Sequence, residues 1–213
     1  MTIPAHFLAL KDSFPAMLTA YDITPIRRFQ CLPGRPIKGI YKTCTDLAYQ
    51  FTATSKLAPR DTFVFHTGYS KGKELLNILG RALPPLETWE VGMAIDPAPV
   101  VPPGPGPRTA PAALCDFNAR LLELLNLFFL RHDFDPTKPS AKIFLAINKA
   151  PGTPYYQGAK ALNTVLLVHK ETAARLVAWL TQAVSPKPVR GFDFSILRER
   201  LQMDPNPPPV IAI

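Results

Sequence analysis

The chain of 213 residues is 47% hydrophobic and 19% charged, a composition that favours a folded core and excludes a largely disordered polypeptide. Its 25 prolines exclude a long helical bundle or coiled coil, because each proline inside a helix costs about 3 kcal/mol. The formal net charge of +8 makes polyanions, and nucleic acid in particular, the first partners to consider.

The beginning of the chain combines short helices with a pair of strands. Residues 5–20 are predicted to hold one or two short helices, with Asp12 or Ser13 as the N-cap. Residues 39–54 are rich in β-branched and aromatic side chains and alternate with period two, which predicts a strand. A turn follows this segment, and residues 62–66 are predicted to form its partner strand.

A helical pattern follows these two strands. A stripe of leucine and isoleucine side chains predicts a helix over residues 70–83, which the two prolines that follow it terminate. Residues 88–95 alternate again and predict another strand. Residues 96–111 are dense in proline and have no apolar period, so they are predicted to form an extended linker or a long surface loop.

The second half is predicted to contain further helices and strands. Residues 113–131 have the strongest helical pattern and are apolar nearly all round, which predicts a helix that is buried on several sides or seals an oligomer interface. Two more helices are predicted over residues 170–184 and 195–201, the second with Ser195 as its cap. Two short apolar runs are predicted strands: residues 143–147 and 161–169.

The order strand, loop, strand, helix therefore occurs twice, in residues 39–83 and in residues 141–184. Alternation of hairpins with helices favours a mixed or antiparallel sheet over a doubly wound parallel one. The predicted fold class is α+β, with a small twisted mixed or antiparallel sheet, or an OB-like barrel, packed with three to four helices. A single domain is expected, made of two hairpin-and-helix lobes, a proline-rich connector and an extended tail: residues 20–96, 113–203, 97–112 and 204–213.

The sharpest local motif is TGYSKGK at residues 67–73, between a predicted strand and a predicted helix. Backbone amides at such a turn can cradle a phosphate. A Walker-type loop needs four residues between its glycines, whereas three residues separate Gly68 from Gly72, and Glu74 occupies the magnesium-ligand position. The motif argues against nucleotide hydrolysis and leaves two interpretations, an ordinary lysine-rich turn or a non-catalytic phosphate contact.

Basic and aromatic residues occur together in three segments of the chain. Single-stranded nucleic acid is held by this mixture, because bases stack on aromatic rings while cations neutralise phosphates. Eight basic residues are predicted phosphate contacts: Arg27, Arg28, Lys38, Lys42, Lys71, Lys73, Lys149 and Lys160. Four tyrosines are predicted to stack on bases: Tyr41, Tyr69, Tyr155 and Tyr156. The alternative is that the tyrosines pack on the sheet and the lysines only solvate its surface.

Catalysis has little support in the sequence. The four histidines lack metal-ligand spacing, and no cysteine lies near any of them in sequence. His132 with Asp133 and Asp135 could hold a metal ion, but this cluster is more typical of a solvated helix end. His66 and His169 each end a predicted strand, so an enzyme hypothesis needs folding to bring them into one cleft. We therefore expect a protein that is not an enzyme and holds no cofactor or metal.

The leading hypothesis is a non-catalytic protein that binds single-stranded DNA or RNA. The alternative is a structural or assembly subunit of a viral or other multimeric particle, with homo-oligomer contacts through the apolar helix 113–131 or through the tail 204–213. That tail has two interpretations, a strand added to a neighbour's sheet or a segment folded back on its own core. No apolar run approaches 18 residues and the three cysteines form no C-x-x-C pair, so we expect a soluble cytoplasmic protein without membrane contact.

Overall fold

The computed structural model describes residues 3–58, 61–81, 86–87, 89 and 114–213. The chain divides into two compact units, Met1–Thr109 and Ala110–Ile213, and each is described by itself. The boundary between the units falls inside the segment predicted to be a proline-rich connector. That connector and almost all of the predicted strand at 88–95 lie outside the described residues. The expectation that both lobes form a single domain stays a prediction.

The first unit is built on a four-stranded sheet with the order β5-β4-β1-β6. Its main strands are β1 (Tyr21–Gln30), β4 (Leu47–Ser55) and β5 (Thr62–Gly68), and they pair antiparallel, whereas the short β6 (Leu86–Glu87) runs parallel to β1. The predicted α+β class with a mixed sheet is confirmed. The OB-like barrel is not: among the described strands β5 and β6 are the outer ones and do not pair, so this sheet is open.

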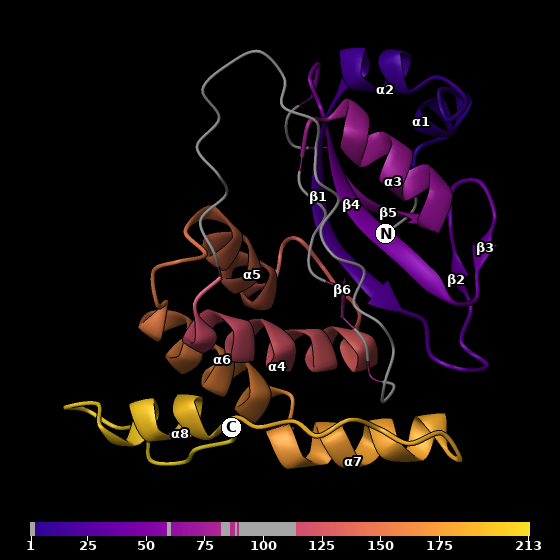
Figure 1. Ribbon diagram of the computed structural model, residues 1–213. Coiled ribbons are helices and arrows are strands. Elements are labelled where there is room, and N and C mark those ends of the chain that lie inside the picture. Colours follow the sequence, from indigo (N-terminus) through magenta and orange to yellow (C-terminus); the bar gives the residue numbers. More distant parts are fainter. Residues whose placement is uncertain (1–2, 59–60, 82–85, 88, 90–113) are drawn as a thin grey trace. The chain divides into compact units, whose positions relative to one another are not determined.

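Three helices cover one face of this sheet (Figure 1): α1 (Ala5–Ala9), α2 (Phe14–Ala20) and α3 (Tyr69–Ile78). The alternation along β4 directs Tyr49, Phe51 and Ala53 to the helices, where they join a core with side chains from all three helices. The prediction of short N-terminal helices is confirmed, and Ser13 caps α2 by accepting a hydrogen bond from the amide of Ala16.

The segment between β1 and β4 forms a small hairpin. The prediction of one long strand over residues 39–54 is correct only for β4, because two shorter strands precede it, β2 (Ile37–Lys38) and β3 (Thr43–Cys44). The amide of Ile40, inside this hairpin, donates a hydrogen bond of 2.9 Å to the carbonyl oxygen of His66 in β5. The hairpin is therefore fixed at the end of β5, beside the start of α3.

The described residues of the second unit form helices and connecting turns organised around α4 (Asp116–His132), which contacts all four later helices (Figure 1). The later helices are α5 (Pro139–Lys149), α6 (Tyr156–Val168), α7 (Ala173–Val184) and α8 (Ser195–Gln202). The predicted helices over residues 113–131, 170–184 and 195–201 are confirmed. The described residues form eight helices in all, rather than the three to four expected.

The predicted strands at residues 143–147 and 161–169 are wrong, because both segments belong to helices, α5 and α6. A short apolar run has the same composition in a buried strand and in a buried helix. The helical period is visible only when the polar residues before the run are included: Ser140, Ile143, Phe144 and Ile147 form the buried stripe of α5. The repeated order of hairpin and helix is therefore absent from the second unit.

The end of the chain folds back onto the second unit. Ala212 and Ile213 are buried, the carbonyl oxygen of Ala212 accepts the amide of Ala173, and that of Ile213 accepts Nε of Arg198. Of the two interpretations of the tail, the structure shows the fold-back. Ser195 is the first residue of α8 rather than its cap: Phe194 is the N-cap. None of the described helices is both long enough and apolar enough to cross a bilayer.

Candidate nucleic-acid interface

Four of the predicted phosphate-binding lysines gather around the start of α3 in the first unit. Lys38 and Lys42 come from the β2–β3 hairpin, whereas Lys71 and Lys73 are the third and fifth residues of the helix. Lys42 lies at the helix start itself, because its Cε is 3.2 Å from the position that a Cβ on Gly68 would occupy. We name these four lysines the α3 basic cluster.

Two lysines of the cluster, Lys71 and Lys73, lie over aromatic rings. Nζ of Lys71 is 5.5 Å from the ring centroid of Phe14 and 5.8 Å from that of Tyr41, and Nζ of Lys73 is 5.9 Å from that of Tyr69. These are cation–π distances. The cations therefore have defined positions, but they occupy ring faces on which a base would stack.

Tyr41 is held in place by its phenol group. Its hydroxyl donates a hydrogen bond to the carbonyl oxygen of Lys11. Burial raises the pKa of Tyr41 to about 12, and the nearby carboxylates of Asp12 and Glu74 add to this shift. The hydroxyl therefore remains a neutral donor at physiological pH, and the ring is part of the packing around α2 rather than an exposed platform.

Arg27 and Arg28 are not part of the exposed cluster, because their side chains are buried, 4% and 2% exposed. Nε of Arg27 donates to Oε1 of Gln50 at 2.8 Å, and Nε2 of Gln50 lies 2.9 Å from Nε2 of His66. Because arginine only donates, Gln50 accepts with its oxygen and donates with its nitrogen, so Nε2 of His66 is the acceptor and its proton is on Nδ1. Burial and the charge of Arg27 lower the pKa of His66 to about 4.

The predicted residues of the second unit surround the turn between α5 and α6, a helix-to-helix connection rather than the expected strand hairpin. Lys149 is exposed at the end of α5, and Tyr155 is half-buried where α6 begins. Lys160 is paired with Asp204 at 2.8 Å. Tyr156 is 46% exposed, and the guanidinium of Arg200 lies 4.5 Å from its ring centroid. Tyr156 is the predicted stacking residue that the structure leaves most accessible.

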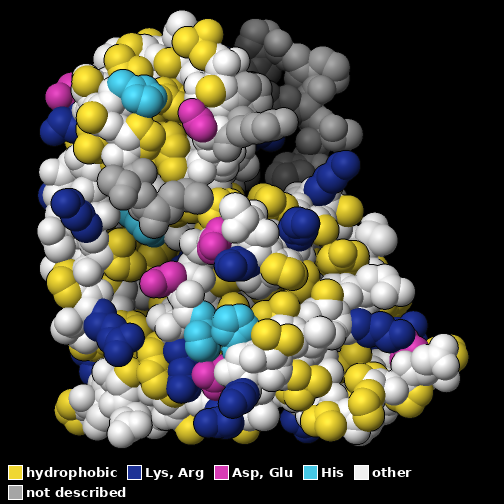
Figure 2. All heavy atoms as spheres, turned by 180° about the vertical axis from the view of Figure 1, so that it is seen from behind, with side chains coloured by type: hydrophobic (Ala, Val, Ile, Leu, Met, Phe, Trp, Pro, Cys, Tyr) yellow, Lys and Arg dark blue, Asp and Glu magenta, His cyan; other side chains and the backbone are white. Residues whose placement is uncertain are grey.

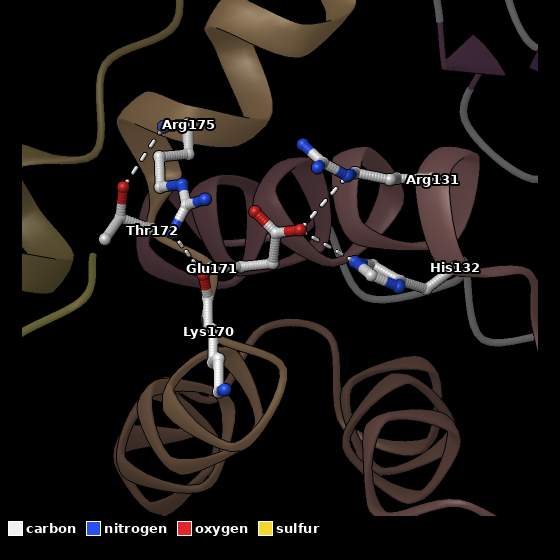
Figure 3. A network of polar contacts seen from close by, with 6 residues as sticks. All are labelled: Arg131, His132, Lys170, Glu171, Thr172 and Arg175. Carbon is white, nitrogen blue, oxygen red and sulfur yellow. Dashed lines mark hydrogen bonds and ion pairs between the residues drawn. The ribbon is translucent and has the colours of Figure 1, made fainter.

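A polar network in the second unit was missed by the sequence analysis. Oε1 of Glu171 forms an ion pair with Nε of Arg131 at 3.0 Å and lies 3.1 Å from Nε2 of His132, with which it shares a hydrogen bond; Glu171 is 4% exposed (Figure 3). His132 also stacks on Phe128, and its ring centroid is 4.9 Å from that of His169. Local spacing offers no signal for this group, because His132 ends α4 whereas Glu171 lies 39 residues later, between α6 and α7.

Asp135, which the sequence grouped with His132 as a possible metal ligand, is not part of this network. Asp135 instead accepts hydrogen bonds from the amide and hydroxyl of Thr137, and these bonds lower the pKa of its carboxyl group. In the described part of the chain, no three His, Cys, Asp or Glu side chains are arranged to hold a metal ion. His66 belongs to the first unit and His169 to the second, so the condition of the enzyme hypothesis, that they share a cleft, is untested.

The cysteines of the first unit are poorly suited to nucleophilic chemistry. Cys31 and Cys44 are buried and unpaired as disulfides. Burial, with smaller contributions from Cys44 and Asp46, raises the pKa of Cys31 to about 12, and burial also raises the pKa of Cys44. Both groups are thiols at neutral pH, whereas the thiolate is the reactive form.

On the face drawn in Figure 2, Lys and Arg side chains form separate groups with apolar and acidic side chains between them, rather than one continuous stripe. No protein-family model matches the chain, and no curated protein and no solved structure matches it. The function therefore has to be argued from the residues and contacts of this chain alone.

Proposed function

We propose that this is a non-catalytic protein that binds single-stranded DNA or RNA, mainly through phosphate contacts at the α3 basic cluster. The observation that carries the proposal is the gathering of four lysines around one helix N-terminus. The N-terminal end of a helix has unpaired amides and a partial positive charge. Lys71 and Lys73 lie within the first five residues of α3, and its first turn contains no acidic side chain. A bound phosphate would relieve this concentration of positive charge.

The positions of the lysines support a role for the phosphate backbone rather than for base recognition. Lys71 has one ion pair, with Glu74 at 2.8 Å, in which both side chains are about half exposed. An exposed pair of this kind is weak and exchanges readily with another anion. Tyr41, Tyr69 and Tyr156 each have a cation over the ring, and Tyr156 is the exposed one of the three. We therefore assign base stacking first to Tyr156 and treat Tyr155 as packing.

The test is a fluorescence-anisotropy titration of the full chain with a labelled oligothymidylate and an oligouridylate of ~20 nucleotides. We expect binding at ~50 mM salt, and a plot of log K against log salt with a slope of about −3, because each of four phosphates neutralised on a single strand contributes about −0.7. Absence of binding to both oligonucleotides at ~50 mM salt would contradict the proposal.

The matched control uses the same change of charge elsewhere. Replacing the four lysines of the α3 basic cluster with glutamine is expected to abolish measurable binding. Replacing four exposed lysines of the second unit is expected to change affinity much less: Lys138, Lys142, Lys170 and Lys187. Equal losses in the two variants would show that net charge, and not the cluster, is responsible.

The alternative is a structural or assembly subunit, and it was motivated by the apolar helix α4 and by the tail. The apolar sides of α4 contact α5, α6, α7 and α8, and the tail is held by the second unit's own helices. Both features are thus accounted for within one copy of the chain. A monomeric mass by light scattering at micromolar concentration would exclude this alternative, whereas a defined oligomer would favour it.

A further inference from the structure

Three buried side chains form a polar row across the sheet of the first unit. Arg28 in β1 pairs in register with Tyr49 in β4, and Tyr49 pairs with Thr67 in β5. Residues in register on neighbouring strands have their side chains on the same face. Tyr49 packs in the core under the helices, so Arg28 and Thr67 share the helix-covered face. Their exposed fractions are 2% for Arg28 and zero for the other two residues.

Arg28 lacks what a buried cation requires. Its Nε and Nη1 have no hydrogen-bond partner among the described residues, and neither has Oγ1 of Thr67. The guanidinium group cannot lose its proton at physiological pH. An unpaired buried charge is among the most destabilising features that a fold can contain. A partner with acceptor oxygens and negative charge would relieve this cost.

The described interior of the first unit offers no such partner. Its buried polar side chains are all neutral or positive: Arg27, Arg28, Gln30, Gln50 and Thr67. Arg27 is already engaged with Gln50. Among the described residues of this unit, the carboxylates that form ion pairs are Asp22 and Glu74, and their side chains are 74% and 50% exposed. Arg28 therefore has no acid among the described side chains of this core.

The row lies directly under α3. A Cβ on Gly72 would be 2.3 Å from a ring carbon of Tyr49 and 2.8 Å from Oγ1 of Thr67, so only glycine allows the helix this close. Gly68, the N-cap of α3, follows Thr67 immediately. The polar row, the positive end of α3 and Lys42 thus occupy the same end of the sheet.

We propose that the first unit binds a phosphate group at this end of the sheet, with Arg28 as its charged ligand and the Thr67 hydroxyl as a second donor. Arginine presents several N–H groups in a planar fork that matches phosphate oxygens. Because Arg28 is buried, the group that reaches it is the terminal phosphate of a strand. An internal phosphodiester carries chain on both sides and needs an open groove. This inference rests on the proposed function, and free inorganic phosphate shares the same chemistry.

The first experiment uses inorganic phosphate and the full chain. Thermal unfolding is followed with and without ~10 mM phosphate, at an ionic strength matched with sodium chloride. A ligand that binds the folded state raises the melting temperature. We expect a rise for the wild type and none for Arg28→Gln. Thr67→Val, which keeps the shape of the side chain, is expected to weaken phosphate binding about tenfold. The control Lys170→Gln should respond like the wild type.

Thr67→Val keeps the inference testable if Arg28→Gln does not fold. A wild type that does not respond to phosphate, or a Thr67→Val variant with unchanged phosphate affinity, would overturn the assignment of this row. A lost response in Lys170→Gln would show a general effect of charge and would overturn it as well.

The second experiment separates this inference from the proposed function. Oligothymidylates with and without a 5′ or 3′ phosphate are compared by anisotropy. We expect about tenfold tighter binding of one terminally phosphorylated strand, and loss of this preference in the Thr67→Val variant. Equal binding of all strands would overturn the terminal-phosphate assignment and leave the proposed function standing. A response to inorganic phosphate without binding of any oligonucleotide would keep the phosphate site and reject the nucleic-acid function.

Discussion

The two units carry the same formal charge but distribute it differently. Each contains twelve basic and eight acidic residues, a net charge of +4. In the second unit, cations meet carboxylates that are largely buried: Arg131 pairs with Glu171, Arg120 and Arg190 share Glu123, and Lys160 meets Asp204. In the first unit, Arg27 meets an amide, Lys56 and Lys71 pair with the exposed carboxylates of Asp22 and Glu74, and Arg28 has no described partner at Nε or Nη1. Lys71 and Lys73 also lie over aromatic rings.

This difference separates charge that stabilises a fold from charge that remains available to a ligand. A cation paired with a buried carboxylate is already neutralised and gains little from an external anion. A cation over an aromatic ring keeps its full charge. We therefore expect the two units, in spite of their equal net charge, to differ in their capacity for phosphate, and the following predictions test that comparison.

The largest effect is expected from Glu171→Ala. This change leaves Arg131 and His132, which are 29% and 25% exposed, without their shared acceptor. We expect the free energy of unfolding to fall by about 3 kcal/mol, since breaking a buried pair costs about 3–5 kcal/mol and partial exposure reduces the loss. Urea denaturation followed by circular dichroism measures it. Glu199→Ala, at an exposed position of α8, is the control, and equal losses in both variants would remove the distinction between buried and surface charge.

A pH effect is expected next, and in the first unit. Because the pKa of His66 is lowered to about 4, the folded state keeps this ring neutral while the unfolded state takes up a proton below pH ~6.5. Stability from this residue is complete above pH ~6.5 and is lost as the pH falls toward 4. Between pH 7 and pH 5 we expect a loss of about 2 kcal/mol. Urea midpoints should show this dependence in the wild type and in His6→Gln, and a much smaller one in His66→Gln.

A smaller loss is expected where the tail is anchored. Asn163 is 1% exposed; its Nδ2 donates to the carbonyl oxygen of Val210 and its Oδ1 accepts the amide of Ala212. Asn163→Ala leaves these two backbone groups without their partner, and we expect a loss of about 1–2 kcal/mol in urea denaturation. The exposed Asn206→Ala is the control. No loss in Asn163→Ala would show that these polar contacts do not stabilise the second unit. That result would contradict the comparison between the two units.

The smallest effect is expected from Lys71→Gln. Its pair with Glu74 is exposed, so the free energy of unfolding should change by less than about 0.5 kcal/mol. The affinity for an oligonucleotide should nevertheless fall measurably, because one phosphate contact is lost. A large loss of stability would show that the lysine is structural and would weaken the contrast between the two units.

Patterns along the chain predicted the elements whose period was long or flanked by clear signals. Ser13 and the stripe of α3 located two helices, and alternation located β4 and β5. Residues 143–147 and 161–169 were misassigned because apolar runs of this length fit a strand and a helix equally well. The clustering of Lys71 and Lys73 at the start of α3 was also predictable, since both follow a strand directly.

Composition and periodicity thus determined the α+β class, the helices with a strong stripe and the general positive charge. The tertiary structure alone decided which cations are neutralised. Glu171 meets His132 across 39 residues of sequence, and Arg28 lies beside Tyr49 only because β1 and β4 pair in that register. Burial and partners depend on which elements pack together, and that packing joins residues that no local spacing relates.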